Sequence, residues 1–203
     1  MKIALCLFLS YLLGTLNPAA LIARLMHKDL RDSGTKNLGA TNVGMHFGKR
    51  LAIPVMLFDL FKAFFAVVIA EILVPSIAWM PLLAGALAVV GHIFPFYLGF
   101  RGGKGLAAFG GMVLGLSPWL FLLLLLVCGT VMLVCNYSLG LVISAAILFP
   151  FLITLKSGGN LTVLLIACLI SALLVFRFRE NFTKIREGRE FRVRDYIKQK
   201  LMK

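Results

Sequence analysis

Two glycine-rich segments of this chain combine the residue types that bind phosphate. The first segment, residues 32–44, alternates Ser, Thr and Asn side chains with three glycines. Glycines in tight turns expose backbone N–H groups, which together with hydroxyl groups can surround an anion. The glycine spacing matches neither a P-loop nor a dinucleotide-binding fingerprint, so a flexible polar linker also fits this segment.

The second segment, residues 91–105, closes with a basic run that contains three glycines. Gly102 and Gly103 precede a helix expected to begin near residue 105, so their free N–H groups and the positive helix end would face a bound anion. Arg101 and Lys104 add fixed positive charge. A basic membrane anchor alone would not need the glycines, which favours an anion site.

Charged and ionisable residues also occur inside apolar stretches. Asp59 and Lys62 are three residues apart, so they share one face of a helix. Both residues lie inside an apolar stretch that is long enough to cross a membrane. Charges inside a membrane are costly and usually pair, which predicts a structural ion pair. His92 could act as a general base, although a single histidine at a helix start is more often a hydrogen-bonded structural residue.

A third polar cluster follows the last apolar run, at residues 177–190. Phe178, Phe182 and Ile185 recur there at helical spacing, which also fits a basic amphipathic anchor. We expect this cluster to lie on the same side of the membrane as the two glycine-rich segments. Three polar clusters at one end of an apolar bundle indicate a ligand site.

Membrane-spanning helices must position these clusters. Of 203 residues, 61% are hydrophobic and 14% are charged, and the mean hydropathy is +0.97. Soluble domains are ~45–50% apolar and ~25% charged, so a soluble enzyme, a disordered protein and a disulfide scaffold are excluded. The four cysteines lie inside apolar runs without metal-like spacing, which predicts neither a disulfide nor a thiolate metal site.

The sequence predicts an all-α integral membrane protein, a bundle of seven transmembrane helices in one domain over residues 1–203. Crossing a ~30 Å hydrocarbon layer takes ~20 residues. The first segment runs on through Asn17-Pro18 and is too long for a signal peptide. Ser117-Pro118 separates a short fourth segment from the fifth, because Pro favours the first turn of a new helix. The predicted segments are 3–25, 51–74, 80–100, 105–116, 118–134, 139–155 and 161–176.

Positive charge gathers on one side of the predicted bundle. The formal net charge is +13, and ten of the 21 Lys and Arg residues fall between residues 177 and 203. With seven crossings, most of the others lie in connections on the same side as this tail. Basic flanks mark the cytoplasmic side, which places the N-terminus outside and the 177–203 tail in the cytoplasm. Clustering at membrane flanks argues against nucleic-acid binding, which needs a basic face on a soluble fold.

Taken together, the three clusters resemble the PlsY family of bacterial acyl-phosphate:glycerol-3-phosphate acyltransferases, over nearly the whole chain. Any one matching piece would be weak, whereas five in order between matching apolar segments are specific. The pieces are 34–42 (Gly-Ser-x-Asn-Pro-Gly-Ala-Thr-Asn in the family), 59–63 (Asp-x-x-Lys-Gly), 91–105 (Gly-His-x-x-Pro, then Phe-Lys-Gly-Gly-Lys-Gly), Ser138-Leu139 (Tyr-x-Ser-Leu) and 179–182 (Arg-Glu-Asn-Ile).

The resemblance implies an enzyme of the bacterial cytoplasmic membrane that moves a fatty acyl group from acyl phosphate to the 1-hydroxyl of glycerol 3-phosphate. The product is lysophosphatidic acid, a precursor of phospholipids, and the partners are the two substrates and membrane lipids, with no cofactor, metal or nucleic acid. No Ser or Cys nucleophile with an orienting base is evident, so direct attack by the substrate hydroxyl is expected.

The resemblance also implies roles for particular residues. We expect Lys104, Thr35, Ser138 and Asn181 to act on glycerol 3-phosphate in catalysis. The expected substrate-binding residues, chiefly for the acyl phosphate, are Thr41, Asn42, Gly102, Gly103, His92 and Arg177.

Three of the departures from the family pattern concern expected substrate contacts. Met45 stands where the family has Arg, and Phe178 stands where it has His; both family residues would touch phosphate. Thr35 replaces Ser and keeps the hydroxyl. Losing the Arg–phosphate contact or the histidine donor without compensation would cost ~1.5–3 kcal/mol each. The candidates for compensation are His46, Lys49 and Arg177.

Two alternatives to an active acyltransferase stay open. The changes at Met45 and Phe178 fit a catalytically weakened or non-catalytic paralogue that binds lipid. A small anion transporter would need charges near the membrane midplane in both halves of a repeat. The polar clusters instead lie at one end, and no internal repeat is visible in the sequence.

Overall fold

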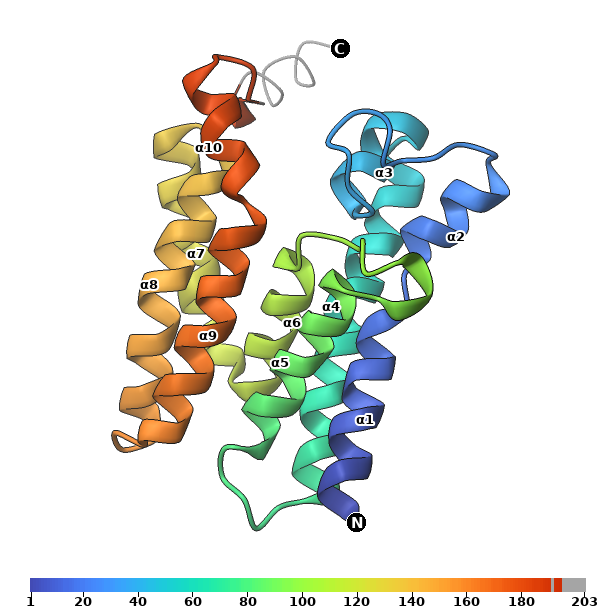
Figure 1. Cartoon of the computed structure of the whole chain (residues 1–203). Helices are drawn as coiled ribbons and strands as arrows, with labels where there is room; N and C mark the ends of the chain where they lie inside the picture. Colours follow the sequence, from blue (N-terminus) through green and yellow to red (C-terminus); the bar gives the residue numbers. More distant parts are fainter. Residues whose placement is uncertain (191, 195–203) are drawn as a thin grey trace. The chain divides into compact units, whose positions relative to one another are not determined.

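A computed structural model describes residues 1–190 and 192–194, and this part of the chain is helical throughout, without β-strands (Figure 1). Residues 191 and 195–203 of the predicted basic tail lie outside the described residues. The chain divides into two compact units, Met1–Pro118 and Trp119–Lys203. The single domain expected over 1–203 stays a prediction.

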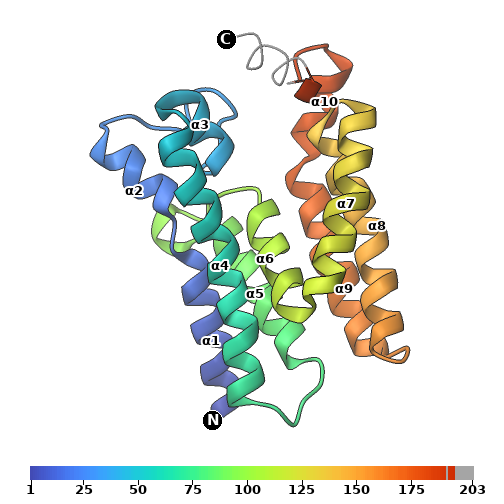
Figure 2. The ribbon, with the colours of Figure 1, turned by 180° about the vertical axis from the view of Figure 1, so that it is seen from behind.

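Unit 1 is a small helical bundle with two polar segments at one end (Figures 1 and 2). α4 and α5 pack against each other and each against both α1 and α6, and α3 packs on α4. A Cβ on Gly111 of α6 would overlap the carbonyl oxygen of Leu60 in α4, so this glycine lets the two helices approach closely. The elements are α1 (Lys2–Thr15), α2 (Pro18–Leu25), α3 (Ala40–Phe47), α4 (Lys49–Leu73), α5 (Met80–Ile93), the 3₁₀ turn η1 (Phe96–Leu98) and α6 (Leu106–Leu116).

The first predicted span is broken rather than continuous. α1 ends at Thr15, and the Asn17 side chain caps α2 by accepting a hydrogen bond from the N–H of Ala20 at 2.9 Å. Pro18 occupies the first position of α2, where its missing N–H does no harm. Both pieces together still form one candidate span, Lys2–Leu25.

The third predicted span is shorter than expected, whereas the fourth is as short as the sequence predicts. α5 ends at Ile93, not at residue 100, because Pro95 cannot continue the helix and disfavours helical geometry in Phe94. The chain then turns through η1 to Gly105, whose φ of 91° suits only glycine. α6 has 11 residues and rises about 16 Å, less than a hydrocarbon layer.

Unit 2 contains α7 (Pro118–Cys135), α8 (Ser138–Lys156), α9 (Leu161–Arg177) and α10 (Arg179–Arg186). α8 and α9 pack together, and the Asn160 side chain caps α9 by accepting from the N–H groups of Thr162 and Val163. α10 follows α9 after a bend of 40°. Three of these helices match predicted spans to within about two residues at each end.

Five helices of the described chain are long and apolar enough to cross a membrane, or six if α9 and α10 count as one bent span. Large apolar side chains cover their outer faces, as on α7, where Leu126 is 70% exposed. A surface of this kind suits lipid rather than water. The chain is therefore an all-α, multi-pass integral membrane protein.

Candidate active site

Asn42 gives the first glycine-rich segment its shape. Its side chain is completely buried on α3, and its Nδ2 donates to the carbonyl oxygens of Leu30, Ser33 and Asn37 at 2.6, 3.2 and 3.1 Å. Its Oδ1 accepts from the N–H of Thr35 at 3.0 Å. The amide of Asn42 therefore shapes the loop, and the substrate-binding role expected for Asn42 stays a prediction.

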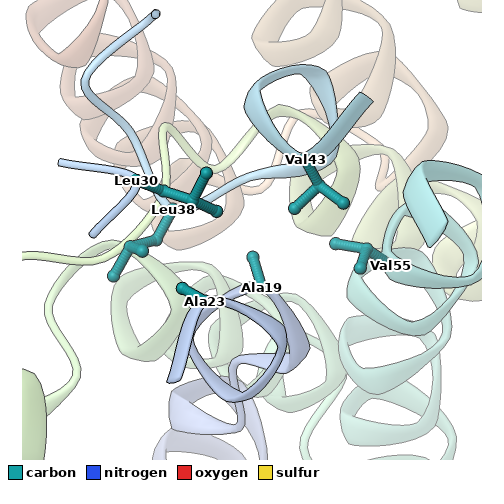
Figure 3. Close-up of a cluster of buried hydrophobic side chains, with 6 residues drawn as sticks. All are labelled: Ala19, Ala23, Leu30, Leu38, Val43 and Val55. Carbon is teal, nitrogen blue, oxygen red and sulfur yellow. The ribbon is translucent and has the colours of Figure 1, made fainter. Parts of the chain in front are cut away.

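Apolar side chains anchor the same loop from beneath (Figure 3). Each buried Leu or Val contributes ~1.5–3 kcal/mol relative to an exposed one. The cluster joins the loop and α3 to α2 and α4 through Ala19, Ala23, Leu30, Leu38, Val43 and Val55. This anchoring favours a shaped loop over a flexible linker.

α3 itself was not predicted from the sequence. Residues 40–47 contain a mid-helix glycine and an Asn, so local propensity alone does not favour a helix there. Packing of Val43 into the apolar cluster stabilises this helix, which local propensity alone does not favour. As a result, Thr41 and Asn42 lie in the first turn of a helix rather than in open turns.

Thr35 carries a hydroxyl without a protein partner. Its Oγ1 is buried and makes no hydrogen bond within the described chain. Leaving a buried hydroxyl unpaired costs ~1–3 kcal/mol. A ligand oxygen that accepts from Thr35 would recover this free energy, which supports the substrate contact predicted for this residue.

His46 lies against the loop, whereas Met45 does not contribute a polar group. The Nε2 of His46 is 3.1 Å from the Oγ of Ser33. Met45 is 46% exposed. The Ser33–His46 contact was missed in the sequence, because the two residues are 13 positions apart. It places His46, one of the three candidates to replace the family Arg, beside the loop that carries Thr35.

An exposed ion pair closes the turn before this loop. The guanidinium of Arg31 lies 2.7 Å from a carboxylate oxygen of Asp29. The hydrogen bonds from Arg31 hold the pKa of the Asp29 carboxyl below its ordinary value. The pair links residues two positions apart and so stiffens only the local turn.

The glycines of the second segment serve a different purpose from the one predicted. The N–H of Gly102 donates to the carbonyl of Ile93 at 3.0 Å, and the N–H of Gly103 donates to that of His92 at 3.1 Å. These N–H groups satisfy the last carbonyls of α5, which a helix end leaves without partners. The N–H groups are therefore not left unpaired as we expected, and substrate binding at Gly102 and Gly103 stays a prediction. Both residues must be glycine because a Cβ would overlap His92.

The predicted ion pair is present, and His92 joins it. The Nζ of Lys62 lies 2.7 Å from the Oδ1 of Asp59 and 2.9 Å from the Nδ1 of His92. Lys62 also donates to the carbonyl of Leu16 at 2.6 Å. His92 is 3% exposed and lies against Gly103, and its expected substrate-binding role stays a prediction.

The two glycine-rich segments of unit 1 lie at the same end of the bundle. Leu98, from η1, packs against the apolar cluster under the first loop. The hydroxyl of Tyr97 donates to the carbonyl of Thr15 at 2.7 Å, and the side chain of Asn17 donates to that of Leu38 at 3.4 Å. These contacts confirm that the two segments are neighbours.

In unit 2, Asn181 is held by an acidic residue that we did not predict. Its Nδ2 donates to the Oε1 of Glu190 at 2.6 Å, and the side chain is almost completely buried. The sequence feature that could have indicated this contact is that Glu190 is an acidic residue inside a basic run. Ser138 begins α8, Arg177 ends α9, and Phe178 is buried at the bend between α9 and α10.

Comparison with known proteins identifies the family. A family model described as glycerol-3-phosphate acyltransferase matches residues 4–188. The chain belongs to the glycerol-3-phosphate acyltransferase family. It is 35% identical over 192 residues to the glycerol-3-phosphate acyltransferase of Aquifex aeolicus, covering 95% of this chain and 100% of the relative. The Coxiella burnetii protein of the same name is 35% identical over 196 residues, covering 96% and 100%.

Solved structures of this family share the fold. The integral membrane glycerol 3-phosphate acyltransferase PlsY (YgiH), in its glycerol 3-phosphate form, superposes with a TM-score of 0.85 and 34% identity, covering 95% of this chain and 96% of that one. Its lysophosphatidic acid form gives a TM-score of 0.82 and 33% identity, covering 95% of each chain.

Proposed function

We propose that this protein transfers a fatty acyl group from acyl phosphate to the 1-hydroxyl of glycerol 3-phosphate, which yields lysophosphatidic acid and phosphate. The observation that carries this proposal is membership of the acyltransferase family over residues 4–188, in a chain that also matches PlsY in fold. The related structures are of glycerol 3-phosphate and lysophosphatidic acid forms, which are the acceptor and product named here.

The proposed reaction is a direct acyl transfer. The 1-hydroxyl oxygen of glycerol 3-phosphate bonds to the acyl carbon, the bond from that carbon to the phosphate oxygen breaks, and the hydroxyl proton passes to the departing phosphate. Both substrates are anionic, so positioning and charge neutralisation supply most of the catalysis.

Particular groups fit these tasks. The Lys104 ammonium neutralises phosphate, and the unpartnered Thr35 hydroxyl donates to a phosphate oxygen. His46 supplies a donor where the family uses Arg. Ser138 and Asn181 stay predicted contacts to glycerol 3-phosphate, and Arg177 a predicted substrate contact.

The contact between Ser33 and His46 suggests a covalent route as the competing mechanism. An acyl-enzyme on Ser33 would need a third group to orient His46. Within the described chain no carboxylate contacts His46. Direct attack therefore remains the better-supported mechanism.

We also propose that the chain crosses the bacterial inner membrane seven times, with the N-terminus outside and the C-terminus in the cytoplasm. This count includes α6, whose 11 residues need local thinning of the bilayer to cross. The distribution of Lys and Arg supports the orientation.

The test is release of phosphate by the purified protein in proteoliposomes. Release that requires both acyl phosphate and glycerol 3-phosphate, with equimolar lysophosphatidic acid, supports the acyltransferase. Flux of glycerol 3-phosphate without turnover supports the transporter. Binding of lipid without either activity supports the non-catalytic paralogue.

A further inference from the structure

Lys62 is a buried ammonium group with all of its donors engaged. An ammonium group has three N–H donors and no acceptor. Its three partners are the Oδ1 of Asp59 at 2.7 Å, the Nδ1 of His92 at 2.9 Å and the carbonyl oxygen of Leu16 at 2.6 Å. The side chain is 1% exposed, so no water competes for these contacts.

This arrangement restricts the proton of His92. Because the ammonium can only donate, the Nδ1 that it contacts must accept, and an accepting Nδ1 carries no proton. The proton of the neutral imidazole is then on Nε2. A proton on Nδ1 could reach the Oδ1 of Asp59 at 3.2 Å, but it would also point toward the Lys62 ammonium.

The other side of the imidazole faces the turn that leads to Lys104. A Cβ on Gly103 would overlap the Nε2 of His92, so this nitrogen lies directly against the glycine. The N–H of Gly103 in turn donates to the carbonyl of His92 at 3.1 Å. Moving the ring would therefore move residues 102–104.

We propose that Lys62 and Asp59 fix His92 in the tautomer protonated on Nε2, and that His92 thereby acts as a positioning residue for Lys104. The part of this proposal that concerns catalysis rests on the proposed function, since Lys104 must contact phosphate for its position to matter. The tautomer itself can be measured without any substrate.

The first test is nitrogen NMR of protein labelled with ¹⁵N-histidine in detergent micelles. The chain has three histidines, and the His92→Gln variant identifies the signals of His92. We expect Nδ1 of His92 to resonate as a non-protonated nitrogen and Nε2 as a protonated one. The opposite assignment in the unmodified protein would overturn the proposal, whether or not the enzyme is active.

A variant of the ion pair extends this test. Lys62→Met alone leaves the buried Asp59 carboxylate without its ammonium partner, which is strongly destabilising, whereas Asp59→Asn with Lys62→Met removes both charges. We expect the double variant to lose the fixed tautomer, so that signals of both tautomers of His92 appear. An unchanged spectrum would show that the pair does not set the tautomer.

The second test compares two amide substitutions of His92 that differ in length by one methylene group. Glutamine can place an N–H near the position of Nε2, whereas asparagine is too short to reach it. Only glutamine keeps a group where Nε2 lies against Gly103, so the turn that positions Lys104 should loosen in His92→Asn, and we expect its kcat to be about tenfold lower than that of His92→Gln. Equal kcat values in two folded variants would contradict the positioning role. An unmodified protein without activity would instead reject the proposed function and leave the NMR result standing.

Discussion

Lys104 is the residue whose loss should affect activity most directly. It follows the two glycines that His92 and Ile93 hold in place, so its backbone is fixed before substrate arrives. Removing one charged donor from an oxyanion site typically lowers kcat by ~10²–10³-fold. We expect this loss in Lys104→Ala, measured as phosphate release with both substrates present.

The matched control for that variant is Lys2→Ala, an exposed residue at the start of α1. It removes the same charge at the end of α1 opposite Thr15, where the segment 91–105 makes contact. Activity should stay unchanged in Lys2→Ala, and comparable losses in the two variants would contradict the assignment of Lys104.

A substitution of Thr35 should lower activity without lowering stability. Thr35→Val keeps the volume of the side chain and removes a hydroxyl that has no protein partner, so the melting temperature should stay the same or rise. We expect kcat/KM to fall about tenfold, because a hydrogen bond to substrate is lost. Thr35→Ser should keep near-normal activity. Activity that survives in Thr35→Val would exclude a substrate contact.

Ser33 distinguishes the two chemical routes. Under direct attack, Ser33→Ala should keep activity within about threefold, because the serine forms no covalent bond to substrate. Under an acyl-enzyme mechanism the same substitution abolishes turnover. Mass spectrometry of the protein after addition of acyl phosphate alone provides a second measurement, and we expect no acyl adduct.

At the scale of elements, the packing of α4 against α6 depends on Gly111. A Cβ there would overlap the backbone of Leu60, so Gly111→Ala should lower the free energy of unfolding by ~1–3 kcal/mol. The control is Gly129→Ala on α7, where a Cβ meets nothing within 4 Å. This change should be neutral or stabilising, and thermal unfolding in detergent measures both. Equal effects would mean that close approach at Gly111 is unimportant.

The long apolar elements could be predicted from the sequence because hydropathy alone specifies them. α7, α8 and α9 are uninterrupted runs bounded by Pro118, Ser138 and Asn160, and each end has a local signal. α4 was recognised in the same way. Helices of this kind need no tertiary information, since the membrane requires every backbone group to be paired within the segment.

The remaining elements depend on contacts that a sequence does not display. α3 forms because Val43 packs into a cluster built from four separate segments. Gly102 and Gly103 looked like phosphate ligands, but they bind the end of α5, and only the position of His92 shows why. The composition of the glycine-rich turn thus predicted where in the chain the turn lies. Its hydrogen-bond partners could be identified only from the three-dimensional structure.

At the scale of the whole molecule, the number and direction of the crossings are open to a direct test. Cysteine substitutions at Ser157, between α8 and α9, and at Lys36, in the first loop, probe opposite sides of the proposed topology. We expect a membrane-impermeant thiol reagent to label Ser157→Cys in intact cells. Lys36→Cys should react only after the membrane is opened, and the reverse pattern would contradict the proposed orientation. A background without the four native cysteines avoids competing signals.

The amide of Asn42 draws the carbonyls of three loop residues to one point, so the loop that carries Thr35 is already in its final shape before any ligand binds. A substrate bound there would lose little affinity to freezing of the chain. Substituting Asn42 should accordingly weaken binding of compounds that never touch it, through a loop that must be ordered anew at each encounter.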